Sequence, residues 1–161
     1  MIPPSGQPEA DAFWMDRALG QARLAAGRGE VPIGCVIVRG GELLASAHDG
    51  KELFWEPTAH AEILAIRQAA ARAGDWRLDG ATLYVTLEPC PMCAGAMLHA
   101  RIARLVYGAS NPRWGACSGA CNLLADTRFN HRVEIHAGVR EEACAALLRE
   151  TFRQWRRAKR G

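Results

Sequence analysis

The chain has 161 residues, of which 49% are hydrophobic, so a single domain with a sizeable core is the default expectation. No run of about 18 apolar residues occurs, and this excludes a membrane-spanning helix. The formal net charge of +3 is too small to point to a partner by itself. We interpret residues 1–8 as a short disordered lead rather than a secretory signal, and we expect one domain over 9–158, a tail over 159–161 and a cytoplasmic location.

The first third of the chain predicts a helix followed by a β-hairpin. Apolar residues recur at helical spacing over 9–27, and Gly27 should end this helix. An apolar, β-branched run over Val31–Val38 predicts a strand, Gly40-Gly41 a turn, and Glu42–Ala47 the second strand.

Strands and helices alternate through the rest of the chain. In chain order we expect a helix over 59–73, a strand over Ala81–Leu87, a helix from Pro91 to His99, a strand over Leu105–Gly108, a loop over Arg113–Gly119, a short helix around Leu123-Leu124, a strand over Val133–His136 and a helix over 140–158. Thr58 is the expected N-cap of the helix over 59–73, and Gly74 its stop. In the helix over 140–158, the residues expected to face inward are Ala143, Ala146, Leu147, Phe152 and Trp155. The alternation predicts an α/β layered domain around one central sheet.

Two short motifs carry the chemistry. His60-Ala61-Glu62 is followed by Pro89-Cys90-Pro91-Met92-Cys93, and His60, Cys90 and Cys93 are side chains that can hold one zinc ion. Three protein ligands leave a fourth position open for water, which is the layout of a catalytic zinc site. The pattern H-x-E…P-C-x-x-C is an established signature of zinc deaminases.

Glu62 is the expected proton carrier. Zinc lowers the pKa of its bound water to about 7, so hydroxide is available at neutral pH. Glu62, two residues past His60, can take the proton of that water and pass it to the substrate and the leaving ammonia. Backbone N–H groups near Cys90, at a helix start, are expected to hold the hydroxide or the tetrahedral intermediate. Glu88 is interpreted as a structural hydrogen-bonding residue that turns the strand into this helix.

The other cysteines leave one alternative open. A C-x-x-C pair beside a histidine motif favours metal binding over disulfides. Cys35 and Cys144 lie among apolar residues and are expected in the core. Cys117 and Cys121 could form a second metal site, or either could be a fourth ligand to a purely structural zinc, for which His99 also qualifies.

Four segments resemble bacterial tRNA adenosine deaminases, a family with the cytidine-deaminase-like fold, over roughly residues 10–158. The segments are Pro57–Ile63, Thr82–Ala96, Arg128–Glu134 and Glu142–Leu148. The resemblance implies a three-layer α/β/α fold with a five-stranded mixed central sheet. It also implies conversion of adenosine to inosine at the wobble position of tRNA-Arg, binding of the tRNA anticodon stem-loop, and a homodimer in which the zinc-site helices pack near the partner's active site.

Six residues are expected to contact the substrate, and the chain departs from the family pattern at two of them, Asp49 and Asn111. These contacts are Asp49, Ala61, Pro89, Asn111, Arg113 and Arg153. The family usually has Asn in place of Asp49, and an ionised carboxylate accepts hydrogen bonds but donates none. Asp49 near Glu62 should also raise the proton affinity of one of the two. Asn111 replaces an acidic residue, and this predicts broader tolerance for the nucleic-acid backbone, DNA included; Glu56 in place of Asp changes less.

Two features bear on a nucleic-acid substrate, and each has a plainer interpretation. Arg149, Arg153, Arg156 and Arg157 share one side of the last helix, either to contact an anticodon stem or as a solvated face. Arg113 and Trp114 either grip flanking nucleotides or belong to an ordinary surface loop. The alternative functions are deamination of a free base or nucleoside of the guanine or cytosine type, action on single-stranded DNA, and a catalytically inactive RNA-binding module.

Overall fold

The structure is a computed structural model and describes residues 6–161; residues 1–5, which hold most of the expected lead, lie outside the described residues. Its elements are α1 (Pro8–Gly27), β1 (Gly34–Arg39), β2 (Glu42–His48), α2 (Lys51–Phe54), α3 (Ala61–Ala73), β3 (Thr82–Leu87), α4 (Pro91–Ala100), β4 (Arg104–Ala109), β5 (Glu134–Ala137) and α5 (Glu141–Arg160). The last helix thus continues two residues beyond its expected end and into the expected tail. Among the described residues, the helices are too short or too polar to span a bilayer.

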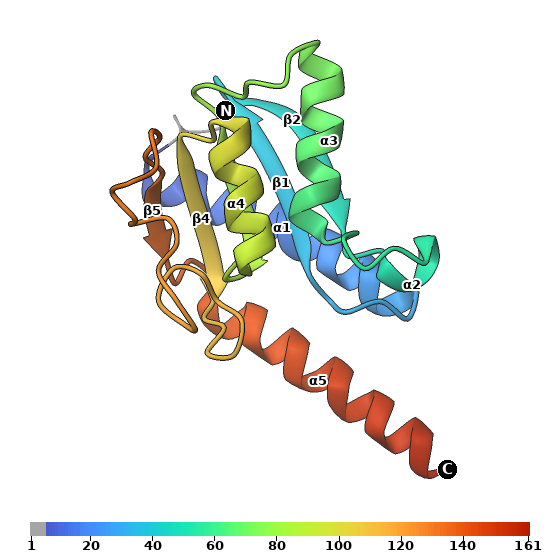
Figure 1. The fold of residues 1–161 in the computed structure, drawn as a ribbon. Coiled ribbons are helices and arrows are strands. Elements are labelled where there is room, and N and C mark those ends of the chain that lie inside the picture. Colours follow the sequence, from blue (N-terminus) through green and yellow to red (C-terminus); the bar gives the residue numbers. More distant parts are fainter. Residues whose placement is uncertain (1–5) are drawn as a thin grey trace.

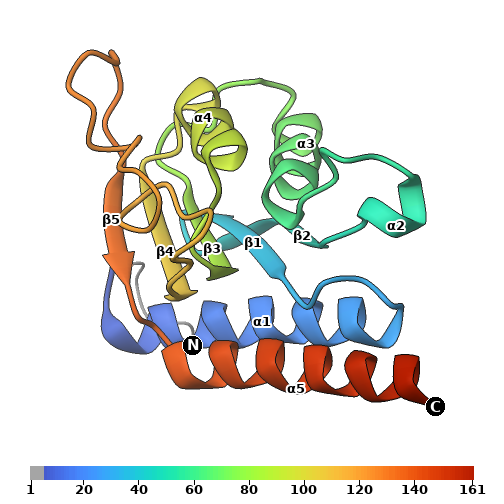
Figure 2. The same cartoon turned by 60° about the horizontal axis from the view of Figure 1, so that its bottom comes forward.

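The five strands form one mixed sheet in the order β2-β1-β3-β4-β5. The pairs of β1 with β2 and with β3 are antiparallel, whereas β3–β4 and β4–β5 are parallel. Helices α3 and α4 cover one face of the sheet, and α1 and α5 lie on the other (Figures 1 and 2). The predicted three-layer α/β/α fold is confirmed.

Alternation along the strands supplies a core on each side of the sheet. On β1, Cys35 and Ile37 pack toward α3 and α4, while Val36 and Val38 pack with residues of α1. Because side chains alternate between the faces of a strand, a run that is apolar throughout is buried on both faces. Cys144 lies in the core on the α5 side, so it and Cys35 are buried as expected.

Several local expectations are wrong. The N-cap of α3 is His60, and the Thr58 hydroxyl instead donates to Glu56 Oε1 at 2.7 Å. No helix forms around Leu123, where the chain is held in turns by backbone hydrogen bonds such as Leu123 N to Ala116 O, at 2.9 Å. Ala143 is exposed because α5 rests on the sheet through another side, centred on Cys144.

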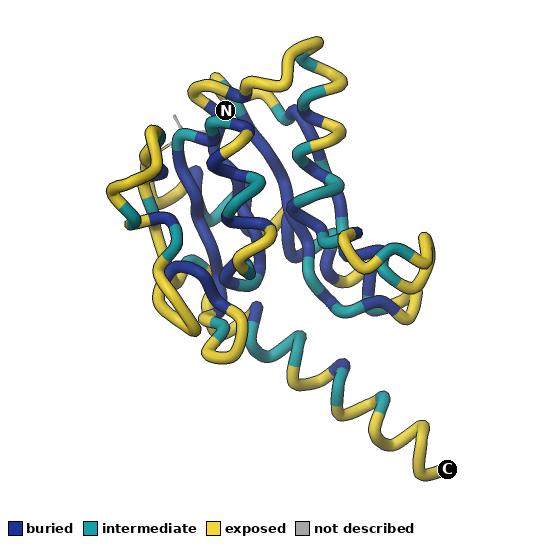
Figure 3. The backbone as a smooth tube through the Cα atoms, viewed as in Figure 1, coloured by how far each residue is buried: buried dark blue, intermediate teal, exposed yellow. Residues whose placement is uncertain are grey.

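The second half of α5 extends from the body of the protein and is largely exposed (Figures 1 and 3). Phe152 and Trp155 are half-buried and meet edge to face, with ring centroids 5.5 Å apart, so they line the inner side of the helix only in part. Arg149 and Arg153 form ion pairs with Glu142 and Glu150. Beyond them, the outer end of α5 carries mainly basic side chains into solvent.

Helix α2 was not expected from the sequence, and a buried carboxylate explains it. Glu30 follows α1 and is 1% exposed; its two oxygens accept hydrogen bonds from the backbone N–H groups of Glu52, at 3.2 Å, and Leu53, at 2.6 Å. A negative charge there stabilises the start of a helix, whose first N–H groups have no intrahelical partner. Glu30 therefore fixes α2 and with it Lys51, which reaches the site described below.

Candidate active site

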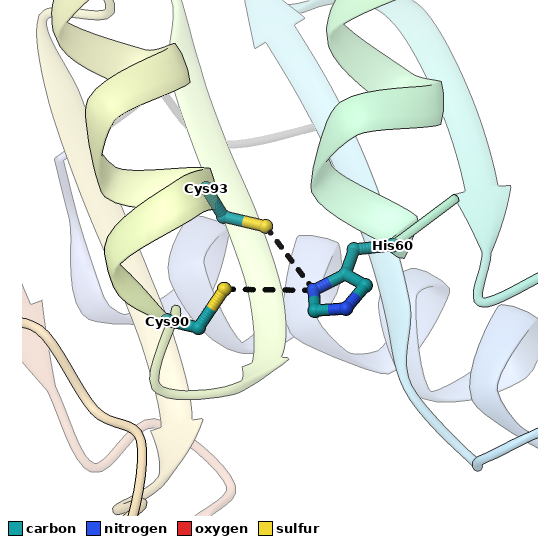
Figure 4. Close-up of side chains that lie close together, drawn as sticks. All are labelled: His60, Cys90 and Cys93. Atoms are coloured by element: carbon teal, nitrogen blue, oxygen red, sulfur yellow. Dashed lines mark hydrogen bonds between the residues drawn. The ribbon is translucent and has the colours of Figure 1, made fainter. Parts of the chain in front are cut away.

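The two motifs meet where two helices begin. His60 immediately precedes α3, and Cys90 immediately precedes α4, whose first turn contains Cys93. Pro91 starts α4, where its missing N–H is not needed. The side chains of His60, Cys90 and Cys93 point toward one another (Figure 4). Their ligand atoms all lie within 4.8 Å of one another.

The geometry of this group fits a tetrahedral metal ion. The Nδ1 atom of His60 lies 3.6 Å from Cys90 Sγ and 3.5 Å from Cys93 Sγ. For zinc with bonds of about 2.3 Å to sulfur and about 2.05 Å to nitrogen, a tetrahedral angle separates the two ligand atoms by about 3.5 Å. Two thiols and an imidazole are also the donor set that zinc prefers. The residues therefore fit the ion that the sequence predicts.

The three side chains also shift one another's protonation. The contact with Cys93, aided by His60, lowers the pKa of the Cys90 thiol to about 4. The same contact raises the pKa of Cys93, and the contact with Cys90 raises that of His60. The arrangement thus stabilises a thiolate at Cys90. Metal binding requires deprotonated cysteines, so this ligand is prepared for it.

Glu62 lies beside the group without belonging to it. The residue is 4% exposed on the first turn of α3, and burial raises the pKa of its carboxyl group to about 7. A carboxyl group with that pKa can both accept and donate a proton near neutral pH. Glu62 also lines the same cavity as His60 and Cys90.

This cavity has a volume of about 480 Å³, within the range typical of small-molecule sites. Its walls come from α2, the starts of α3 and α4, the end of β3 and the loop after β4. The lining residues are Ile33, Lys51, Pro57, His60, Glu62, Leu87, Glu88, Cys90, Pro91, Met92, Asn111 and Trp114. A cavity that is largely apolar, with a few acidic and basic groups beside a metal-ligand set, suits a flat heterocyclic substrate.

Glu88 holds the loop that closes one side of the cavity. Its Oε1 accepts the N–H of Asn111 at 3.1 Å, and its Oε2 accepts the N–H groups of Cys117, Ser118 and Gly119, each at 3.0 Å. Glu88 as a residue is 1% exposed, so these bonds are shielded from water. The predicted structural role is thus seen, although Glu88 organises the loop after β4 rather than the turn into α4.

Asp49 is buried and contacts Lys51, which lines the cavity. It is 1% exposed; its Oδ1 accepts a hydrogen bond from Lys51 Nζ at 3.4 Å, and its Oδ2 has no partner among the described residues. Burial raises the pKa of Asp49, while Lys51 and His60 lower it. Glu30, and not Glu62, is the neighbouring carboxylate that raises it further.

Of the other expected substrate contacts, Asn111 lines the cavity, whereas Ala61, Pro89, Arg113 and Arg153 are not among its lining residues. Asn111 lines the cavity, with its Oδ1 accepting the N–H of Trp114 at 3.2 Å. Ala61 and Pro89 are buried beside lining residues, Arg113 is exposed next to Trp114, and Arg153 lies out on α5. A contact of these residues with substrate stays a prediction.

Sequence reasoning missed Lys51 as a lining residue and gave no role to Met92. Lys51 lies two residues after Asp49, and its charge beside that carboxylate was the signal available. Within residues 6–161, only His60, Cys90 and Cys93 form a group of three or more possible metal ligands. Cys117 is buried and Cys121 exposed, so the described residues give no support to a second metal site there.

Comparison with known proteins agrees with this fold and site, which are those of cytidine-deaminase-like enzymes. The family model of MafB19-like deaminases matches residues 9–156. A tRNA-specific adenosine deaminase of Bacillus subtilis is 49% identical over 151 residues, which are 93% of each chain. A solved structure from work on A-to-I editing by tRNA:A34 deaminases is 43% identical, with a TM-score of 0.82 over 84% of this chain and 99% of that one. The guanine deaminase of Bacillus subtilis is 38% identical, with a TM-score of 0.59 over 61% and 63% of the two chains.

The chain therefore belongs to the family of tRNA-specific adenosine deaminases, and it is a hydrolase that acts on a C–N bond.

Proposed function

We propose that the chain is a zinc-dependent enzyme that deaminates adenosine to inosine at the wobble position of tRNA-Arg. The observation that carries this proposal is one cavity lined by Glu62, whose pKa is raised to about 7, and by two of the three side chains whose spacing fits tetrahedral zinc. A site that served only for folding would not need an ionisable carboxyl group in a substrate-sized cavity.

The reaction replaces the amino group on C6 of adenine with oxygen; one water enters and ammonia leaves. His60, Cys90 and Cys93 would hold the zinc ion, which when bound acts as a Lewis acid and lowers the pKa of a coordinated water. Glu62 would take one proton from the attacking water and deliver it to a ring nitrogen. It would then take the second proton from the hydroxyl group formed on C6 and pass it to the departing amine, so that ammonia leaves and the C6 carbonyl remains. Its raised pKa suits both directions of transfer.

Support for a nucleic-acid substrate comes from the relatives and from α5. The relative of 49% identity is named a tRNA-specific adenosine deaminase, and the similar solved structure is described as acting at the wobble position. The exposed end of α5 carries Arg156, Arg157, Lys159 and Arg160, a charge pattern that suits phosphate contacts. An unpaired anticodon base is also the cheapest to bring into a closed cavity.

We further propose a homodimer and a cytoplasmic location. The dimer is implied by the family resemblance, with the zinc-site helices near the partner's cavity. The location follows from the proposed substrate, since tRNA is used where proteins are synthesised. The expected tolerance for DNA at Asn111 also stays a prediction.

The test is mass spectrometry for inosine in a tRNA-Arg transcript treated with the zinc-loaded protein. We expect inosine at the wobble position and nowhere else in the transcript. A parallel reaction with protein freed of metal by a chelator should give no inosine. Ammonia release from free guanine or cytosine, with no inosine in the transcript, would reject the proposed substrate.

Asp49 decides between the proposed substrate and a free base such as guanine. We expect Asp49→Asn to raise kcat/KM for the tRNA transcript by about 2- to 10-fold, the worth of one added hydrogen bond between neutral groups. An amide both donates and accepts, whereas the Asp49 carboxylate only accepts and already engages Lys51. The measurement is kcat/KM for the transcript, and for guanine, with both proteins.

A fall in transcript activity in Asp49→Asn, together with guanine turnover by the original chain, would favour the alternative. The guanine deaminase of Bacillus subtilis gives that alternative its support, since it shares 38% of aligned residues with this chain.

A further inference from the structure

Trp114 exposes a large aromatic side chain at the rim of the cavity. Its side chain lines the cavity of His60 and Glu62, yet the residue is 66% exposed. A large aromatic ring at the rim of a cavity loses most of the benefit of burial. Exposed aromatic surface beside a binding cavity often marks a contact with a ligand or partner.

The exposure does not come from a loose loop. Asn111 Oδ1 accepts the N–H of Trp114, and Asn111 O accepts that of Gly115 at 2.8 Å. A Cβ atom added to Gly115 would collide with the Glu88 carboxylate, so backbone and carboxylate are in close contact. The loop is thus wound around a buried charge that accepts four backbone N–H groups, and the indole projects from a fixed backbone.

The same contacts fix the indole relative to the reacting centre. Glu88 directly precedes Pro89 and Cys90, and the N–H of Ala116 donates to Pro89 O at 2.8 Å. The loop that carries Trp114 is therefore tied to the strand end that supplies a metal ligand. A group that stacks on this indole would be held at a constant position relative to the cavity, without further ordering of the loop.

The proposed substrate supplies such a group. A cavity of about 480 Å³ suits one nucleoside, so the bases on either side of the reacting adenosine must remain at its mouth. Unstacked bases bind aromatic side chains, with a gain of about 1–3 kcal/mol per base. The exposed Arg113, next to Trp114, places a cation beside the same path for a phosphate.

We propose that Trp114 is a stacking platform for the base adjacent to the reacting adenosine of an RNA loop, and that Arg113 contacts the phosphate between them. This rests on the proposed function, because a free base has no neighbour to stack. Trp114 is a positioning residue and takes no part in the proton transfers.

The experiment measures RNA affinity in a chain that binds without turnover. The Glu62→Ala protein is combined with Trp114→Ala or Trp114→Phe, and each is titrated by fluorescence anisotropy with an anticodon stem-loop. Two further stem-loops lack the base on the 5′ or the 3′ side of the adenosine. We expect Trp114→Ala to weaken binding of the intact RNA by about 5- to 100-fold, and Trp114→Phe to retain most of the affinity.

Trp76 supplies a matched control. It is 62% exposed and, like Trp114, has an arginine beside it, with Arg77 5.4 Å from the ring centroid. It follows the end of α3 opposite His60, so the 13 residues of that helix, about 20 Å, separate it from the site. Trp55 is less suitable, because it lies two residues from Pro57, which lines the cavity. Trp76→Ala should leave RNA affinity unchanged.

The RNA lacking one base identifies the contact. If Trp114 stacks on that base, Trp114→Ala and the missing base lower affinity by overlapping amounts, and the double change costs little more than either alone. Equal loss on all RNAs, loss equal to that of Trp76→Ala, or a changed oligomeric mass in Trp114→Ala would overturn the proposal. The last result would place the indole between two copies of the chain. Absence of inosine from the transcript rejects the proposed function separately, since the affinities are measured without turnover.

Discussion

Replacing Glu62 with Gln or Ala is expected to lower kcat on the tRNA substrate by at least about 10²–10⁴-fold, the usual contribution of a positioned acid–base group. Glu62 lines the cavity but lies outside the group of possible metal ligands. Metal content, measured by plasma mass spectrometry, should therefore stay at the level of the unchanged protein. The Glu62→Gln substitution keeps the size of the side chain and removes only the group that titrates, so its loss of activity reports proton transfer.

His60→Ala is the matched comparison for this experiment. It removes one of the three possible metal ligands, two residues from Glu62 at the same helix start, so metal and activity should be lost together. The two variants separate proton transfer from metal binding. Turnover within tenfold of the original in Glu62→Gln, or loss of metal from it, would show that the carboxyl group has another role.

The group of possible metal ligands could be predicted from the sequence because metal binding restricts both residue types and spacing. Cys90 and Cys93, three residues apart, fall on one face of a helical turn, and Pro91 marks where that helix begins. His60 is recognised through Glu62, because a carboxylate two residues past a ligand suits hydrolysis and not folding. The long apolar strands likewise predicted a buried sheet, because a strand that is apolar on both faces must be covered on both faces.

The missed features depend on contacts between distant segments. Helix α2 has only four residues and forms where Glu30, more than twenty positions earlier, accepts its first N–H groups. The backbone of the loop after β4 is held by hydrogen bonds to Glu88, so the conformation of the loop could not be predicted from its own residues. Thr58 is a good N-cap by residue type, yet His60 occupies that position, which leaves its ring free to reach the cysteines.

Contacts through α2 and Lys51 connect Glu30 to Asp49. Glu30 positions α2, and α2 brings Lys51 to the cavity and to Asp49. Lys51 donates a hydrogen bond to one carboxylate oxygen of Asp49, and the other oxygen has no partner among the described residues. We therefore expect Lys51 to influence any effect of Asp49 on substrate choice, because the two side chains are in contact.

Removing the carboxylate of Asp11 is expected to cost about 3–5 kcal/mol of unfolding free energy, as for other buried ion pairs broken on one side. Asp11, on α1, accepts two hydrogen bonds of 2.7 Å from Arg104 on β4 and one of 2.9 Å from the Tyr84 hydroxyl on β3. The Asp11 and Arg104 side chains are 3% and 10% exposed. In Asp11→Ala the guanidinium would remain buried without its partner, and urea unfolding measures the loss.

Asp16 provides the control on the same helix. It forms a two-contact ion pair with Arg140, at 3.1 Å, but these side chains are 54% and 48% exposed. Exposed pairs contribute about 0–1 kcal/mol, so Asp16→Ala should change stability little. Equal changes in unfolding free energy from the two substitutions would show that burial does not determine the contribution of the Asp11 pair to stability.

The Asp11 contribution should also depend on pH in a defined direction. Burial by itself raises the pKa of Asp11, but the hydrogen bonds from Arg104 and Tyr84 outweigh it and leave the pKa below its usual value. A carboxyl group with a lower pKa in the folded state stabilises the protein fully above the unfolded value of about 3.9 and loses this contribution as the pH falls through the folded value. The difference in unfolding free energy between the original chain and Asp11→Asn should therefore be constant from neutral pH down to about 5 and shrink below about 4. A difference that keeps its neutral-pH size well below pH 3 would show that the ionised carboxylate is not the stabilising form, because below about 3.9 the carboxyl group of the unfolded chain is protonated and unfolding is favoured by proton uptake.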